Sequence, residues 1–376
     1  EGKLFRSKSN SGAVSSILFD SSGVIVRWRA VHQFVPRFAR GDAIGSHVAW
    51  IRDHLRSRGC HSEIFVGTEN QDTSAETFDP QEIDRHVQSK ADTLLLYHVA
   101  QASPCAQFLL ERTEPLALVF HNFTPPELLL HWDPAVAFEL LKAQDQLNDL
   151  VEKSLFAICD SDFNAQVLGE FGQLERYVIP LPVETSPRSE ITRGAKPTVL
   201  FVGRIAPNKG IHDLIVAVCI LRQRLPEVRL RVIGASTTKS YDTAIKGLID
   251  ALGLSEVVSL TGWIDDEQLD REYRQASVFC TLSDHEGFGV PIVEAMARGI
   301  PVVAHENTAI GQTVGDAGLL LKSKTPTVVA ATLERVLTDN VLASHLSDSG
   351  FHRSKAFAPI SIAEKLDRAL SSDHSL

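Results

Sequence analysis

The chain has 376 residues, of which 44% are hydrophobic and 22% charged, and its formal net charge is −10 at pH 7. This balance is typical of an ordinary globular protein and excludes a disordered chain, a collagen or a small disulfide scaffold. At roughly 150 residues per domain the length predicts two domains, and the absence of a strongly basic half predicts no nucleic-acid partner.

The first 23 residues differ from the rest of the chain. They are rich in serine and glycine and show no regular hydrophobic period. We interpret residues 1–23 as a leader or an added extension rather than a signal peptide, because a charged start followed by a long apolar run is missing. No apolar run in the sequence approaches the roughly 20 residues that a membrane span needs.

From residue 24 the chain alternates apolar runs of strand length with segments of helical period. Helices are expected at residues 104–110, 135–150 and 161–170, and an earlier one begins after Asp42 as its N-cap and ends at Gly59. Strands are expected at residues 28–34, 63–66, 94–97, 116–120 and 155–159. This alternation predicts a parallel sheet covered by helices on both faces, which forms an N-terminal domain over residues 24–184.

Residues 180–197 interrupt the alternation with proline, serine, threonine and charge, and we interpret them as a linker between domains. Strands are then expected at residues 198–202, 228–233, 257–260, 278–281, 301–304 and 318–321. We expect an α/β fold of two tandem doubly wound, Rossmann-like domains, the second over residues 185–355. A C-terminal helix within residues 356–376 is expected to pack back on the first domain. Ligands of such folds bind at the carboxyl ends of the strands and in the cleft between domains.

The loop after the first strand of the second domain combines a glycine with two cations. Gly203 permits a sharp turn, and Arg204 and Lys209 lie five residues apart before a helix. Two cations beside a helix N-terminus can form a site for an anion such as a diphosphate. The alternative is a solvated loop with ordinary surface cations.

A second loop carries the sequence EGFGVPIVE. Gly287 and Gly289 expose backbone N–H groups at the start of the next helix, and the carboxylates of Glu286 and Glu294 can accept hydrogen bonds from vicinal sugar hydroxyls. A solvated helix residue is the alternative for Glu294, but its apolar neighbours make an isolated carboxylate costly there. In the first domain, Gly45 lies between a strand and a helix, where a small residue lets a phosphate or sugar approach the backbone closely. The alternative is that this loop is a plain helix cap.

Together these loops resemble the retaining glycosyltransferases of family 4, which have the two-domain GT-B architecture. The resemblance covers about residues 24–372 and is most specific over residues 199–321, with VLFVGRIAPNKGIHDLI, EGFGVPIVE and VGDAGLLL. Glu286 and Glu294 are the ends of the E-x7-E motif of that family. In the first domain VHQFVPRFARGDAIG and VFHNFTPPELL are most similar to bacterial members that build surface polysaccharides and glycolipids.

The resemblance implies a role for each matching residue. Arg204 and Lys209 would clamp the diphosphate of a nucleotide sugar, Glu286 would accept from the transferred hexose, and Glu294 from the ribose. The donor-binding set is completed by Gly45, Gly203, Thr261, Gly262, Trp263, Gly287, Phe288, Gly289 and Val290. His121 matches the active-site histidine of the family, although a satisfied core histidine is the alternative. The resemblance implies GDP-mannose or a UDP-hexose as the donor co-substrate, and it implies neither a further cofactor nor a metal.

The sequence departs from the family pattern at Gln312, where glutamate is the commoner residue, and at His285 before Glu286. An epimerase or a non-catalytic nucleotide-sugar sensor are the alternative functions, although both would be expected to lack the paired cations or glutamates. A Rossmann dehydrogenase is disfavoured because no GxGxxG follows a strand.

The acceptor is expected to be a growing glycan or a lipid-linked saccharide, in the cytoplasm or at the inner face of the membrane. Five scattered cysteines fit a reducing compartment. Arg52, Arg56 and Arg58 could give a weak peripheral membrane contact, with a solvated helix end as the alternative.

Overall fold

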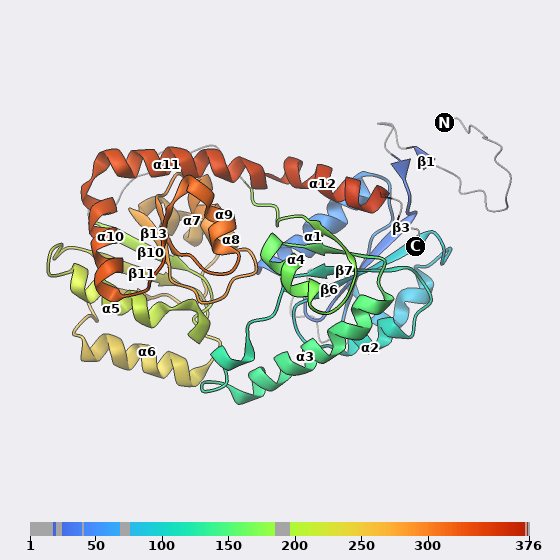
Figure 1. Cartoon of the computed structure of the whole chain (residues 1–376), viewed down its shortest axis with the longest axis horizontal. Helices are drawn as coiled ribbons and strands as arrows, with labels where there is room; N and C mark the ends of the chain where they lie inside the picture. The colour runs from blue at the N-terminus through green and yellow to red at the C-terminus, as the bar shows by residue number, and fades with distance from the viewer. Residues whose placement is uncertain are drawn as a thin grey trace.

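The computed structural model describes residues 18–19, 25–39, 41–67, 76–184, 196–372 and 374. Most of the expected leader and residues 185–195 of the expected linker lie outside the described residues. Figure 1 shows two lobes side by side, the N-terminal lobe in blue to green and the C-terminal lobe in yellow to red. In the described part of the chain, no helix combines the length and apolarity that crossing a membrane requires.

The N-terminal lobe is built on a sheet with the strand order β5-β4-β3-β6-β7-β8-β9, and all neighbouring strands pair in parallel. The strands are β3 (Ala30–Val35), β4 (Ile64–Val66), β5 (Thr77–Phe78), β6 (Thr93–Val99), β7 (Leu116–Phe120), β8 (Phe156–Cys159) and β9 (Glu175–Val178). Every residue of β3, β6, β7 and β8 is buried, as expected for a parallel sheet with both faces covered.

The helices of this lobe start at the carboxyl edge of the sheet, because each follows a strand. They are α1 (Ala43–Ser57), α2 (Pro104–Leu110), α3 (Pro134–Lys153) and α4 (Asp162–Gly169), with short 3-10 helices η1 (Pro80–Arg85) and η2 (Pro126–Leu128). Asp42 caps α1 by accepting from the N–H of Gly45 at 2.5 Å, and Ser161 caps α4 by accepting from the N–H of Asn164 at 3.1 Å. Both caps hold the helix starts beside the strand ends.

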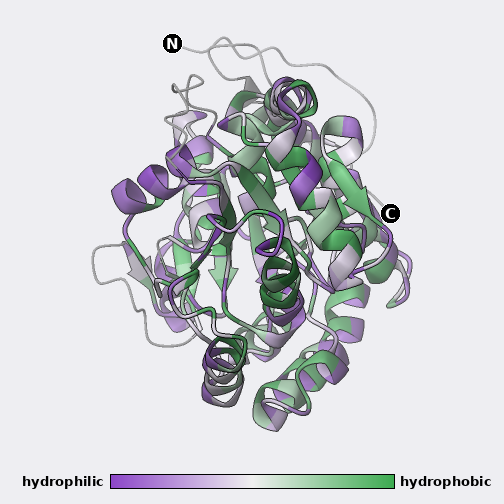
Figure 2. Cartoon of the chain, turned by 90° about the vertical axis from the view of Figure 1, so that its left-hand side faces the viewer, coloured by the Kyte–Doolittle hydropathy of each residue, from purple (hydrophilic) through white to green (hydrophobic). Residues whose placement is uncertain are grey.

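The C-terminal lobe repeats this plan with the strand order β12-β11-β10-β13-β14-β15, again parallel throughout. Its strands are β10 (Thr198–Val202), β11 (Arg229–Ile233), β12 (Val258–Leu260), β13 (Val278–Thr281), β14 (Val302–His305) and β15 (Leu319–Leu321). The ribbon of the central strands has the colour of hydrophobic residues, while the surrounding helices also carry hydrophilic stretches (Figure 2).

Helices follow nearly every strand of the C-terminal lobe. They are α5 (Ile211–Leu221), α6 (Lys239–Ala251), α7 (Asp266–Gln275), α8 (Val290–Ala297), α9 (Ile310–Val314), α10 (Pro326–Thr338) and α11 (Asn340–Ser354), with 3-10 helices η3 (Pro207–Lys209), η4 (Gly315–Ala317) and η5 (Lys355–Phe357). The two lobes therefore present the carboxyl ends of two parallel sheets, where ligands of doubly wound folds bind.

The last helix, α12 (Pro359–Ser371), crosses from the C-terminal lobe to the N-terminal lobe (Figure 1). Ile362, Leu366 and Leu370 of α12 join the core cluster that contains Trp28 and Ile51 of the first lobe. This apolar contact ties the end of the chain to the domain at its start. A two-residue strand, β1 (Leu18–Phe19), pairs antiparallel with β2 (Ile25–Val26) next to this region.

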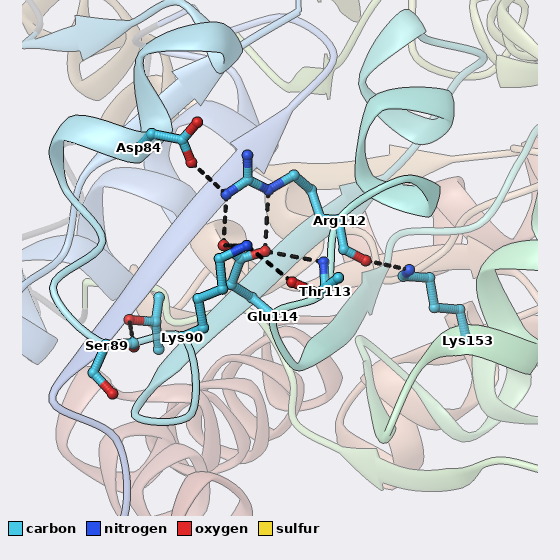
Figure 3. A network of polar contacts seen from close by, with 8 residues as sticks. Asp84, Ser89, Lys90, Arg112, Thr113, Glu114 and Lys153 are labelled. Atoms are coloured by element: carbon cyan, nitrogen blue, oxygen red, sulfur yellow. Dashed lines mark hydrogen bonds and ion pairs between the residues drawn. The ribbon is translucent and has the colours of Figure 1, made fainter.

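An ion-pair network surrounds one buried carboxylate at the start of β7, away from the carboxyl edge of the sheet (Figure 3). The carboxylate of Glu114, whose side chain is fully buried, accepts from Arg112 Nε at 3.0 Å and lies 3.6 Å from Lys90 Nζ. Arg112 also bonds Asp84 at 2.6 Å, and Lys153 donates to the Arg112 carbonyl at 2.6 Å. A buried carboxylate is costly without such partners, so these contacts compensate for the burial of Glu114.

Candidate active site

A partly buried ion pair joins two loops at the carboxyl edge of the C-terminal sheet. Lys209 Nζ, at the end of η3 after β10, lies 2.7 Å from Glu286 Oε1 in the loop after β13. Ser283 donates its hydroxyl to the same Oε1 at 2.8 Å, and the Glu286 N–H donates to Thr308 Oγ1 at 3.0 Å. Burial alone would raise the pKa of Glu286, but the Lys209 ammonium and the Ser283 hydroxyl hold it below its usual value. Glu286 is therefore an ionised acceptor beside a cation.

The loop that carries Glu286 leads into the N-terminus of α8. Gly289 adopts a left-handed φ of +93°, and a Cβ there would lie 2.9 Å from the Ile292 side chain. No hydrogen bond among the described residues uses the N–H groups of Phe288, Gly289 and Val290. These groups and the helix dipole can receive an anion, while the ring of Phe288 is buried in the core.

Glu294 lies on α8 and faces a tyrosine rather than a cation at hydrogen-bond distance. The Tyr273 hydroxyl donates to Glu294 Oε2 at 2.7 Å. Burial raises the pKa of Glu294 above its usual value, because the low-dielectric surroundings disfavour its charged form. The two glutamates predicted as a pair therefore differ in acidity, with Glu286 the more acidic.

The turns after β10, β11 and β12 lie against one another. The Gly203 N–H donates to the Ile233 carbonyl at 2.9 Å, and the Gly234 N–H donates to the Gly262 carbonyl at 3.0 Å. A Cβ on Gly234 would lie 2.0 Å from the Gly203 carbonyl oxygen, so glycine is required there. Arg204 is exposed beside this contact, and its side chain forms no ion pair with a described residue.

The residues beside Gly262 differ in exposure. The Thr261 hydroxyl bonds within its own turn, 3.0 Å from the Gly262 carbonyl oxygen. Trp263 is 72% exposed, which leaves its ring available for stacking. The sequence-predicted set in the second domain thus collects at one edge of the sheet.

The N-terminal lobe approaches the Glu286 loop at Gly287. The Ser161 hydroxyl donates to the Gly287 carbonyl oxygen at 2.8 Å across the two lobes. A Cβ on Gly287 would lie only 2.5 Å from the carbonyl oxygen of His121. The structure therefore brings the main chain of His121 to the glycine-rich loop of the other lobe.

The ring of His121 is held inside the N-terminal lobe. Its Nδ1 lies 2.8 Å from Asp160 Oδ2, and its Nε2 lies 3.0 Å from His98 Nδ1. Gln33 donates from Nε2 to the Val48 carbonyl, so its Oε1 must accept from His98 Nε2 at 3.0 Å. Burial holds the pKa of His98 well below its usual range, so His98 Nδ1 carries a lone pair and His121 Nε2 donates to it.

This chain of bonds occupies both ring nitrogens of His121. In this arrangement the ring offers no free nitrogen to a ligand. An active-site histidine that contacts its ligand through the side chain would need one. Burial also raises the pKa of Asp160, although the neighbouring His121 opposes that shift.

Within the described residues, the histidine cluster is the one set with metal-binding geometry. His47, His98 and His121 each offer a nitrogen, and these atoms lie within 4.8 Å of one another. Because His98 and His121 already bond to each other, a metal ion would have to replace that hydrogen bond. The Lys209–Glu286 site does not depend on this cluster.

Gly45 lies in the first turn of α1, and packing explains its identity. A Cβ there would lie 1.9 Å from the Ala39 carbonyl oxygen, so only glycine fits beneath the preceding loop. This contact holds the start of α1 at the end of β3, whether or not a phosphate approaches it.

Solved structures with the same two-lobe arrangement cover nearly the whole chain. The sucrose-phosphate synthase from Thermosynechococcus elongatus superposes with a TM-score of 0.72 over 90% of this chain and 98% of that one, at 20% identity. The Anabaena protein Alr3699/HepE, in complex with UDP and glucose, gives a TM-score of 0.69 over 91% and 99%, at 19% identity. The chain has the GT-B fold.

Sequence similarity is concentrated in the C-terminal lobe of this GT-B protein. Residues 183–353 match the model of the family described as glycosyl transferases group 1. Mannosylfructose-phosphate synthase of Agrobacterium fabrum is 31% identical over 176 residues, which are 45% of this chain and 39% of the relative. The chain thus spans less than half the length of the curated relatives it matches.

One supporting segment of the GT-B site had no functional signal in the sequence. Thr308 accepts from the Glu286 N–H, and the Thr313 hydroxyl donates to the Phe288 carbonyl at 2.7 Å. Gln312, noted only as a departure from the family pattern, contacts Asp162 of the other lobe. Residues in and just before α9 therefore hold the Glu286 loop in place through these hydrogen bonds.

The three arginines that could give a membrane contact each lie beside a carboxylate. Arg52 is buried and lies 2.9 Å from Asp53. Arg56 bonds Glu63 at 2.6 Å, and Arg58 bonds Asp367 of α12 at 2.8 Å. Each of these guanidinium groups therefore has an acidic partner, and Arg56 remains solvent-exposed.

Proposed function

We propose that the chain is a retaining, metal-independent hexosyltransferase that moves a hexose from a nucleotide sugar to a hydroxyl acceptor. The observation that carries this proposal is the partly buried Lys209–Glu286 pair in the loop that leads to the start of α8, where three N–H groups bond no described residue. A nucleotide sugar presents an anionic diphosphate next to a hydroxyl-rich ring. The site offers a cation and helix N–H groups for the first and an ionised carboxylate for the second.

The reaction requires stabilisation of the departing nucleoside diphosphate. Lys209, paired with Glu286 in the loop that leads into α8, and the exposed Arg204 after β10 supply two cations, and the N–H groups at the start of α8 can hold phosphate oxygens. Preorganised charge of this kind stabilises the negative charge that develops as the sugar–phosphate bond breaks. In our proposal these cations and N–H groups take the role of a divalent metal. Activity is therefore expected to persist in excess EDTA. A complete loss of activity in EDTA that manganese restores would contradict metal independence.

Glu286 orients the transferred hexose by accepting from its hydroxyls, and Glu294 accepts from the ribose through the oxygen that Tyr273 leaves free. Thr261, Gly262 and exposed Trp263 flank the nucleobase. The main chain of His121, which reaches Gly287, borders the sugar. The acceptor oxygen attacks the face from which the phosphate leaves, and its proton passes to the departing phosphate oxygen.

This front-face displacement retains the α configuration of the donor. Proton NMR of the product linkage measures the outcome directly, because the anomeric coupling distinguishes α from β. An α product is expected, and a β anomer would overturn the retaining assignment.

GDP-mannose or a UDP-hexose is the proposed donor, and a growing glycan or lipid-linked saccharide the proposed acceptor. The name of the Agrobacterium relative and the UDP and glucose in the HepE structure support this range. All five cysteines are free, which supports a reducing compartment such as the cytoplasm, at the inner face of the membrane where the acceptor is lipid-linked.

The test is a donor screen with the purified chain. GDP-mannose and UDP-glucose are each incubated with the protein, and release of the nucleoside diphosphate and of sugar is followed by chromatography. Release from at least one donor, lost in Lys209→Ala, is expected. Conversion of the sugar to its epimer would favour an epimerase, and binding without turnover of any donor would favour a sensor.

A further inference from the structure

We propose that Gln312 and Asp162 are positioning residues that clasp the two lobes together and thereby seat the Glu286 loop for transfer. This inference rests on the proposed function for its catalytic consequence. Its geometry stands on contacts between the lobes alone, so the two can fail separately.

The clasp is a reciprocal pair of hydrogen bonds. Gln312 Oε1, on α9, accepts from the backbone N–H of Asp162 at 3.0 Å, and Gln312 Nε2 donates to the Asp162 carboxylate. Asp162 is the first residue of α4 in the other lobe. Only a side chain with both a donor and an acceptor can make these two bonds at once, which an amide does and a carboxylate does not.

Each half of the clasp is fixed within its own lobe. Arg353 donates from Nη2 to the Gln312 carbonyl oxygen at 2.8 Å and from Nε to the Thr313 carbonyl oxygen at 3.2 Å. On the other side, Ser161 caps α4 and so fixes the backbone of Asp162. The Gln312–Asp162 pair therefore joins two segments that are each held by hydrogen bonds within their own lobe.

Both segments are also hydrogen-bonded to the loop that carries Glu286, one from each lobe. Thr313, next to Gln312, donates to the Phe288 carbonyl at 2.7 Å, and Ser161, next to Asp162, donates to the Gly287 carbonyl at 2.8 Å. With Gln312 and Asp162 bonded, Gly287 lies so close to the His121 carbonyl oxygen that an added Cβ would be 2.5 Å from it. The clasp thus sets the distance between the donor loop and the acceptor lobe.

Exposure of the pair makes the clasp reversible. Gln312 and Asp162 are both solvent-exposed, so water competes for each bond and the gain on closure is small. A weak contact of this kind shifts the balance between open and closed lobes without locking it, which allows substrate entry and product release.

The charge of Asp162 explains why an amide faces it. A glutamate at position 312 would set a carboxylate against the Asp162 carboxylate, and like charges in contact favour separation of the lobes. If Asp162 becomes asparagine at the same time, the new amide can donate to the new carboxylate, whose other oxygen still accepts from the N–H of residue 162. The exchange should restore the clasp.

The experiment compares four proteins: wild type, Gln312→Glu, Asp162→Asn and the double variant. Gln223→Glu, an exposed change that adds the same charge to the C-terminal lobe, is the matched control. Small-angle X-ray scattering measures the separation of the lobes without substrate. Steady-state kinetics give KM and kcat for the donor found in the screen.

We expect Gln312→Glu alone to increase the radius of gyration and to lower kcat/KM by roughly 5-fold to 10-fold, the lower end of typical coupling between sites. Asp162→Asn, the double variant and Gln223→Glu should remain as compact and as active as wild type. A compact Gln312→Glu protein, or a double variant as open as Gln312→Glu, would overturn the proposal. If no donor is turned over at all, the proposed function fails, and the scattering still decides the clasp.

Discussion

Gly287 offers the sharpest single perturbation of the contact between the lobes. A Cβ at this position would lie 2.5 Å from the His121 carbonyl oxygen and 3.2 Å from Asn164 Nδ2. An ordinary carbon–oxygen contact is about 3.3 Å, so Gly287→Ala requires the two atoms to separate by about 0.8 Å. The carbonyl is backbone and cannot rotate away, whereas the lobes can move apart.

The consequence is loss of activity with little loss of folding. Displacements of about 1 Å at a reacting centre can cost on the order of 100-fold in rate, so we expect kcat to fall by about that factor. Overpacking of a core would cost about 1–3 kcal/mol, and relief by lobe movement should keep the loss of unfolding free energy below that range.

The assay combines turnover with urea unfolding, and Gly247→Ala is the control. Gly247 lies within α6, where an added Cβ meets no atom within 4 Å. Alanine there should leave kcat unchanged and raise helix stability by up to about 1 kcal/mol. A Gly287→Ala enzyme with a rate within about two-fold of wild type would refute the reasoning from close approach.

Three further predictions test the site and the fold. Lys209→Ala and Glu286→Ala should each lower kcat by about 100-fold to 1,000-fold in a donor-turnover assay, because each removes a preorganised charge, and near-normal turnover would refute the assigned roles. Arg112→Met should lower the free energy of unfolding by about 3 kcal/mol in urea because it removes both guanidinium bonds to the buried Glu114 carboxylate and leaves only Lys90, 3.6 Å away, as a cation, and a loss under about 1 kcal/mol would contradict this. Burial lowers the pKa of His32 from 6.5 to about 4. Between those pH values the unfolded chain binds more protons than the folded one, so His32 makes the free energy of unfolding fall as pH drops, by up to about 1.4 kcal/mol per pH unit. His32→Phe should remove this contribution, and wild-type and His32→Phe stability curves that run parallel from about pH 7 to about pH 4.5 would disprove it.

The sequence predicts the architecture well because buried parallel strands carry strong apolar runs. The fully buried β6 and β7 lie close to their expected positions. The edge strand β9 was missed because its first two residues are exposed and its pattern is weakly apolar. Strand β5, with only two residues, leaves no period to detect.

The site is harder to predict because its contacts join residues far apart in sequence. The sequence predicts the two loops that carry the glycines, the cations and Glu286 separately. The bond between Lys209 and Glu286 joins residues 77 positions apart, so no local sequence pattern predicts it. The same holds for Gln312, whose partner Asp162 is 150 positions away. Sequence patterns report local geometry, whereas a partner across the lobes appears only in the fold.

The central claim is that Lys209 and the start of α8 hold the diphosphate of a nucleotide sugar, and a crystal structure of the chain with UDP or GDP tests it most directly. The account predicts diphosphate oxygens within hydrogen-bond distance of Lys209 Nζ and of the N–H groups of Gly289 and Val290. A nucleotide bound elsewhere, with the Lys209–Glu286 pair and the N-terminus of α8 untouched, would contradict it.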